Sequence, residues 1–374
     1  MESFFLDDFD SCRRAFKDLA KRALRHFPHS AREKIPVRQS QEPIDTLLLR
    51  RGRKASSKLV ILSSGVHGVE GFAGSAVQRK LLSDMLSGAL PVSCDVLFLH
   101  GVNPYGFRNL RRVNESNVDL NRNFYFKKEK VPQKEHNHGY RRLVSFLNPE
   151  HPFTFWWLEF LVHLLRFGGL LLRLGPRHFM DSVVNGQFEY KRGIYYGGRR
   201  PQPVVKHLRR YFRKALADYR SILLLDIHTG YGEKDGLIFI QNAAPGSAED
   251  KNIARIAGDV PLLRESTNGF YRTAGDFTDF PGRVFPQKEI YPLTLEIGTD
   301  GNMNLRGAIT SSFLVVAENR IHHHGCMFAS NRTKVKEKFL RLFYPARDDW
   351  KRAILTRSVK AAAGLINRFS VLGS

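Results

Sequence analysis

Five short apolar runs, each of a length typical of buried strands, constrain this chain more than any other feature. They are KLVILSSG (58–65), DVLFLHGVN (95–103), SILLLDIHTG (221–230), GLIFIQN (236–242) and YPLTLEIGT (291–299). Apolar residues recur at helical spacing in 71–86 and 207–220, and also in residues 5–26. Strands that alternate with helices predict a three-layer α/β/α fold, in which a mixed, largely parallel twisted sheet lies between helices.

Polar motifs stand at the ends of these runs, where α/β folds carry their chemistry. His67 and Glu70 form H-x-x-E, and His228 is a candidate third ligand; three such ligands suit zinc and leave a position for water. Asp226 shares a strand face with His228 and is a candidate partner for a ligand imidazole. Glu296 lies between apolar residues, and burial would raise its pKa toward the range of a general base. Each motif alone also fits a polar loop, a satisfied core histidine or an ion-paired glutamate.

The segment NPYGFRNLRRVNESNVDLNRNF (103–124) gathers arginines and asparagines into one loop, and arginine binds carboxylates in a bidentate way. In chain order, the motifs HGVEG, NPYG, RRVN, DLNRNF, HTG and LEIGT resemble the zinc metallocarboxypeptidase superfamily. They are most similar to its bacterial branch of carboxypeptidase-like proteins of uncharacterised function, as is GQFEYKRGIYYGG (186–198). The resemblance covers about residues 10–320 and implies a zinc carboxypeptidase-like fold.

This resemblance also implies a metal site and a base. It implies one zinc ion, with His67, Glu70 and His228 as its ligands. It assigns Glu296 as the general base that later acts as the acid. The expected activity is that of a zinc-dependent metallopeptidase, a hydrolase that cleaves an amide bond next to a free carboxylate.

The remaining roles concern the substrate. Arg112 matches the arginine that polarises the scissile carbonyl, with Arg111 as its rival. Asn121 and Arg122 match the pair that binds the terminal carboxylate. The family also supplies a tyrosine from a mobile loop; the stronger candidate here is Tyr271 and the weaker one Tyr231. Two loop acids that could line the site are Asp276 and Asp279.

Two other functions stay open at this point. An N-acyl amino acid deacylase of the aspartoacylase or succinylglutamate desuccinylase type shares H-x-x-E and D-L-N-R, although the longer run of motifs favours the peptidase. Expected substrates are therefore peptides or N-acyl amino acids with a free carboxylate. The third hypothesis is a non-catalytic basic protein on the same scaffold that binds an anionic membrane surface.

The most apolar stretch, HPFTFWWLEFLVHLLRFGGLLLRLGP (151–176), bears on that third hypothesis. Its charged residues and histidine are spaced to share one side of a helix, which predicts an amphipathic helix packed on the domain or lying on a membrane. A spanning helix is the third alternative. We expect a catalytic domain over 1–325 with an apolar helical insertion at about 150–178. A basic extension over 326–374 is expected to form two helices broken at Pro345, serving as a brace or a membrane contact.

Charge and cysteine content limit the setting. The chain has 59 Lys and Arg against 36 Asp and Glu, so its net charge of +23 favours anionic partners. No basic run is interleaved with aromatic residues, so we do not expect nucleic-acid binding. Three widely separated cysteines and an N-terminus without the pattern of a secretory signal favour the cytoplasm, either free or at the inner face of the membrane.

Overall fold

The computed structural model describes residues 4–37, 42–126, 137–264, 275–300 and 304–373. Its strands are β1 (Ala31–Ile35), β2 (Ile44–Leu49), β3 (Lys58–Ser64), β4 (Asp95–His100), β5 (Ser221–Thr229), β6 (Leu237–Gln241), β7 (Leu262–Arg264) and β8 (Glu289–Ile297). Its helices are α1 (Phe9–His26), α2 (Gly71–Ser87), α3 (Pro104–Arg108), α4 (His138–Leu147), α5 (Trp156–Leu174), α6 (Pro176–Val184), α7 (Pro203–Ala215), α8 (Ala248–Ala257), α9 (Phe280–Val284), α10 (Leu305–His324), α11 (Ala329–Phe343) and α12 (Asp348–Val371).

All eight strands form one sheet in the order β1-β2-β4-β3-β5-β8-β6-β7. The central strands β4, β3, β5 and β8 are parallel to one another. The pairings of β1 with β2, β2 with β4, and β6 with β8 are antiparallel. This arrangement confirms the predicted mixed, largely parallel sheet.

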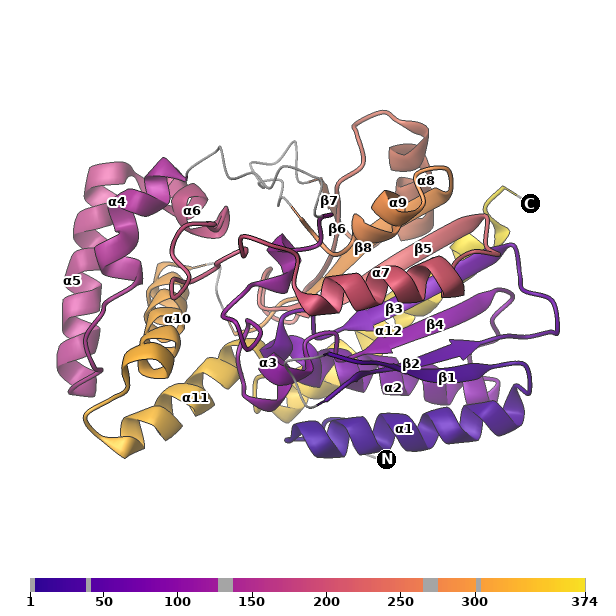
Figure 1. Cartoon of the computed structure of the whole chain (residues 1–374), viewed down its shortest axis with the longest axis horizontal. Coiled ribbons are helices and arrows are strands. Elements are labelled where there is room, and N and C mark those ends of the chain that lie inside the picture. The colour runs from indigo at the N-terminus through magenta and orange to yellow at the C-terminus, as the bar shows by residue number, and fades with distance from the viewer. Residues whose placement is uncertain (1–3, 38–41, 127–136, 265–274, 301–303, 374) are drawn as a thin grey trace.

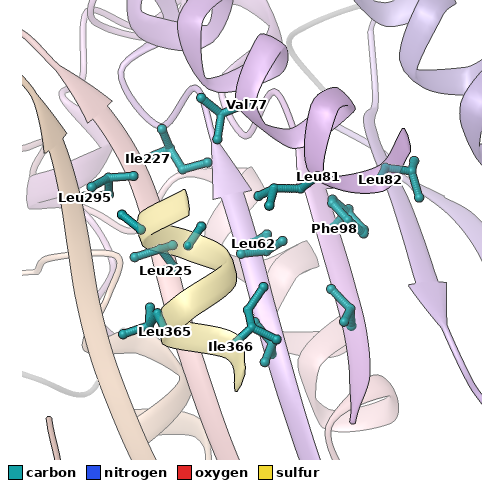
Figure 2. Packing of buried hydrophobic residues seen from close by; sticks show 14 of the residues in the cluster. Leu62, Val77, Leu81, Leu82, Phe98, Leu225, Ile227, Leu295, Leu365 and Ile366 are labelled. Atoms are coloured by element: carbon teal, nitrogen blue, oxygen red, sulfur yellow. The ribbon is translucent and has the colours of Figure 1, made fainter. Parts of the chain in front are cut away.

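Helices cover both faces of the sheet (Figure 1). On one face, Leu62, Leu225 and Leu295 pack with Leu81 of α2 and Ile366 of α12 (Figure 2). On the other face, α7 and α9 cover a second core. Because the central strands bury both of their faces, they consist of continuous apolar runs rather than alternating ones. The predicted three-layer α/β/α fold is therefore confirmed.

A group of helices projects from one side of the sheet, and we call α4, α5, α6, α10 and α11 the helical lobe (Figure 1). Two separate apolar clusters hold it together. The apolar stretch at 151–176 forms α5 of this lobe, and the break at Pro345 separates α11 from α12 as predicted. Among the described residues, no helix is both long and apolar enough to cross a membrane.

The structure adds three strands to the five that the apolar runs predicted. β1 and β2 form one edge of the sheet and β7 forms the other. β1 is largely polar and partly exposed, and β7 has only three residues, so neither has the apolar run of a central strand. The predicted helix at 207–220 instead occupies Pro203–Ala215, because proline suits the first turn of a helix.

Candidate metal centre

His67 and Glu70 lie in the tight turn between β3 and α2. A Cβ atom at Gly68 would collide with the backbone of Gly106 in α3, so this close approach requires glycine. The backbone N–H of Gly68 donates to the carbonyl oxygen of Arg112 at 3.1 Å. The H-x-x-E turn is therefore fixed against the arginine-rich loop.

His228, near the end of β5, faces this turn. Its Nδ1 lies 3.1 Å from Nδ1 of His67 and 2.9 Å from Oε2 of Glu70. Nδ1 of His67 lies 2.9 Å from Oε1 of Glu70. All three residues are buried, and they form a group that could hold a metal ion. The structure thus brings together the three predicted ligands, which come from segments about 160 residues apart.

The far nitrogen of each imidazole contacts a buried carboxylate. Nε2 of His67 lies 3.2 Å from Asp119, and Nε2 of His228 lies 2.6 Å from Asp226. When each Nε2–H donates to its carboxylate, both Nδ1 atoms present lone pairs to the Glu70 carboxylate. A divalent cation would stabilise three acceptor groups this close together, so the residues fit a metal ion.

Asp119 is the important partner that the sequence did not single out. It accepts hydrogen bonds from Arg112 Nε at 3.0 Å and from Arg122. Burial acts to raise the pKa of Asp119, but Arg122 and Arg112 outweigh it and hold the pKa well below its ordinary value. Its position as the first residue of D-L-N-R could have pointed to Asp119. Its contact with His67 could not be predicted from the sequence, because the two residues are 52 positions apart.

Glu296 lies beside the ligand group because β5 and β8 pair in parallel with His228 opposite Glu296. Opposed residues on neighbouring parallel strands point to the same face of the sheet. Among the described residues, Oε2 of Glu296 is buried without a hydrogen-bond partner. Burial raises the pKa of Glu296 to about 8, while the charge of His228 opposes the shift and that of Glu70 adds to it. Such a carboxyl group suits proton transfer near neutral pH.

Adjacent arginines in the loop have different surroundings. Arg111 is 1% exposed and donates through Nε to Glu318 of α10 at 2.9 Å. The side chain of Arg112 is 21% exposed, and one guanidinium nitrogen lies 3.5 Å from Glu70. Within the described part of the chain, only the Arg112 side chain of the two contacts the ligand group, so the geometry favours it over its rival.

Asn121 and Arg122 lie next to Asp119 but are already engaged. Asn121 donates to Asp276 at 3.0 Å and accepts from the backbone N–H of Phe277 at 3.0 Å. Arg122 is buried, donates to Asp119, and reaches the carbonyl oxygen of Val184 at 2.5 Å. Within the described residues, Nε of Arg122 is buried without a partner. Their binding of a substrate carboxylate stays a prediction.

Other loop residues surround this group. Burial and the charge of Asp279 raise the pKa of Asp276 to about 6. Tyr195 has a left-handed backbone (φ 51°), and its ring lies under the guanidinium groups of Arg112 and Arg122, at 4.9 and 5.2 Å. The sequence pointed to Tyr195 only because its segment, 186–198, is similar to the bacterial branch.

Of the two candidate tyrosines, only Tyr231 lies within the described residues. Tyr271 lies outside the described residues. Tyr231 is half-buried, and burial followed by the charge of Glu296 raises its pKa. Tyr231 therefore lies close enough to Glu296, the predicted base, to interact with its charge.

The comparison with known families covers nearly the whole chain. A family model described as "Protein of unknown function (DUF2817)" matches residues 5–357. The chain belongs to the DUF2817 family. The match includes all the candidate ligands and extends through α11 into α12. No curated protein matches the sequence.

Solved structures show which fold this DUF2817 member has. Bovine thrombin-activatable fibrinolysis inhibitor, in complex with tick carboxypeptidase inhibitor, is 12% identical with a TM-score of 0.53, over 98% of this chain and 97% of that one. Carboxypeptidase A from Helicoverpa armigera is 13% identical with a TM-score of 0.51, over 92% of this chain and 76% of that one. At these identities the likeness shows the fold alone, and it confirms a carboxypeptidase-like fold.

Proposed function

We propose that this protein is a zinc-dependent hydrolase of the metallocarboxypeptidase type. The observation that carries the proposal is the convergence of two imidazoles and a carboxylate beside Glu296. Each imidazole is backed by a buried aspartate. This arrangement leaves three acceptor groups facing one another, which a divalent cation would neutralise.

One zinc ion is the proposed cofactor, and His67, Glu70 and His228 are its proposed ligands. Nitrogen and oxygen ligands of this kind are those that catalytic zinc sites use. When bound, zinc supplies Lewis acidity, which polarises a carbonyl group and makes water a better nucleophile. Asp119 and Asp226 hold the two imidazoles in the tautomer that this role requires.

Glu296 and Arg112 are the proposed catalytic groups. Glu296 accepts a proton from the attacking water and delivers it to the leaving amine, for which its raised pKa is suited. Arg112 stabilises the negative charge that develops on the carbonyl oxygen. Its ion pair with Asp119 at 3.0 Å orients its guanidinium group for this role.

The proposed substrate is a peptide or N-acyl amino acid with a free carboxylate beside the scissile amide. Asn121, Arg122 and a tyrosine, with Tyr271 as the candidate, are the proposed contacts to that substrate. Arg122 is held by Asp119 and the Val184 carbonyl. A carboxylate that binds Arg122 must therefore replace the Val184 contact or use the unpartnered Nε. The proposed setting is the cytoplasm, because the sequence has only three, widely separated cysteines.

The test compares two glutamates of the same strand. Glu296→Gln should lower kcat/KM on a blocked dipeptide by about 10³-fold while zinc remains bound, because the base is lost and the ligands are kept. Glu289→Gln is the matched control at the exposed start of β8 and should retain activity. Full activity of zinc-loaded Glu296→Gln would refute the proposed base.

A substrate series tests the carboxylate requirement. The blocked dipeptide with a free carboxylate should be cleaved at least about tenfold faster than its C-terminal amide, because arginine favours carboxylates. Faster cleavage of N-acyl amino acids than of any dipeptide would instead assign the chain to the deacylases.

A further inference from the structure

Helix α5 packs one apolar side, which includes Phe160 and Phe167, on the lobe and leaves another apolar side exposed. Trp157 and Leu165 are each 66% exposed, and Leu172 is 91% exposed. Of the 19 residues of α5, only His163 and Phe167 are buried. In Figure 1, α5 lies at the outer edge of the helical lobe. A surface helix ordinarily presents polar residues to solvent, so a second apolar side that is exposed is unusual.

Polar contacts fix α5 in this orientation. Glu159 accepts two hydrogen bonds from Arg320 of α10, at 2.7 and 2.9 Å. One turn further along, Nε2 of His163 lies 2.8 Å from the hydroxyl of Ser312. These polar side chains of α5 face α10, which leaves the leucine-rich side outward. Rotating the helix to bury its exposed leucines would break these partly buried contacts and would expose Phe160 and Phe167.

Most of the exposed large apolar residues lie on α5 or on segments next to it. Among the described residues, two exposed large hydrophobic side chains, Leu305 and Val371, lie elsewhere. The others belong to α5, to Phe155 just before it, to α6, or to the turn between α10 and α11. The ring of Phe328 in that turn lies 5.2 Å from the ring of Phe155 at the start of α5. We call this set the apolar surface. It consists of Phe155, Trp157, Leu158, Leu161, Val162, Leu164, Leu165, Leu172, Met180, Met327 and Phe328. Such concentrations mark interaction sites rather than chance exposure.

Cations flank the apolar surface. Lys334 and Lys338 of α11 lie 4.3 and 5.9 Å from the ring of Trp156 at the start of α5. Helix α11 carries five Lys or Arg residues and one acidic residue. Arg166 and Arg173 are exposed on α5 itself. By contrast, the single acidic residue of α5, Glu159, is paired with Arg320.

We propose that the apolar surface docks α5 onto an anionic lipid bilayer, with the helix lying in the plane of the interface. Apolar and aromatic side chains beside lysines and arginines are the composition that binds such a surface. A second copy is a poorer occupant. A symmetric dimer would place each apolar surface against its equivalent and bring the flanking cations of both copies together.

Co-sedimentation of the full chain with vesicles tests the proposal. The vesicles contain phosphatidylcholine and phosphatidylglycerol in a ratio of about two to one, or phosphatidylcholine alone. The full chain should pellet with the anionic vesicles, less with neutral ones, and less as salt is raised. A chain that stays in the supernatant with anionic vesicles at low salt would overturn the proposal.

Two variants separate the apolar and the charged contributions. The first variant combines Leu161→Glu, Leu165→Glu and Leu172→Glu, and the second combines Lys334→Glu and Lys338→Glu. Each should lower the bound fraction about tenfold or more. Val371→Glu is the matched control, since Val371 is 69% exposed at the end of α12 and outside the apolar surface. Circular dichroism and thermal unfolding check that each variant is folded.

The same variants address the competing occupant. Unchanged vesicle binding by both multiple variants would contradict the proposal. A second outcome would also contradict it. In that outcome the unsubstituted chain forms dimers, the variant with three leucines replaced does not, and neither chain binds vesicles. The apolar surface would then be a self-association interface.

Discussion

The candidate metal centre and the helical lobe depart from ordinary burial in opposite directions. At the carboxyl edge of the sheet, Asp119, Asp226 and Glu70 are charged groups buried almost completely. On α5, leucines and a tryptophan are left in solvent. Buried charges are retained where they are paired or bind ions, and exposed apolar regions are retained where another surface covers them. We therefore assign chemistry to the first region and docking to the second.

Within the arginine-rich loop, two adjacent arginines have different surroundings. Arg111 is enclosed and joins the loop to α10 through Glu318, whereas Arg112 reaches the ligand group. These neighbours allow the two roles to be separated experimentally.

The largest expected effect on stability comes from Arg111. Arg111→Ala should lower the free energy of unfolding by about 3 kcal/mol, because it leaves Glu318 buried with only its Lys336 contact. Arg112→Ala should cost less stability, since Asp119 keeps Arg122, but it should lower kcat/KM about 10²-fold or more. Urea unfolding and steady-state kinetics measure the two effects.

Arg108→Ala is the matched control from the same stretch of chain. Its ion pairs with Asp10 and Glu42 are exposed, so its loss should change stability by about 1 kcal/mol or less. Equal losses of stability and activity in the Arg111 and Arg112 variants would show that the two arginines share one role.

A smaller effect should appear in the lobe as pH falls. Burial, with a contribution from Arg166, lowers the pKa of His163 to about 4. The unfolded chain binds this proton near pH 6.5, so the contribution of neutral His163 is complete above that pH and is lost as pH falls toward 4. Between pH 7.5 and 5 the loss should reach about 2 kcal/mol.

Urea unfolding of the unsubstituted chain and of His163→Gln at both pH values isolates this contribution. Glutamine can still bond to Ser312 but does not titrate, so the variant should lose less stability on acidification. An identical pH dependence in both chains would show that His163 is not held neutral in the lobe.

The sequence predicted the parts of the protein that depend on local pattern. The apolar runs identified β3, β5 and β8, and the polar residues at their ends identified the candidate ligands and Glu296, which the structure brings together. The structure supplied what depends on long-range contacts. The choice between Arg111 and Arg112 depends on where α10 places Glu318, and the role of Asp119 depends on its approach to His67.

Helix α5 shows the same limit in the lobe. The pattern in 151–176 predicted an amphipathic helix, and the spacing of its polar residues placed them on one side. Which side faces inward was not in that pattern, because it depends on Arg320 and Ser312, about 150 residues further along the chain. The apolar surface therefore emerged only from the packing of α5 against α10.

Zinc content of the purified protein tests the central claim most directly. After equilibration with zinc and dialysis, we expect about one zinc ion per chain in the unsubstituted protein and in His163→Gln, whose histidine is buried away from the ligands. His228→Ala should retain less than about a tenth of that amount, because it loses one of three protein ligands. An unsubstituted chain that holds no zinc, or a His228→Ala variant that holds as much as the unsubstituted chain, would contradict the account.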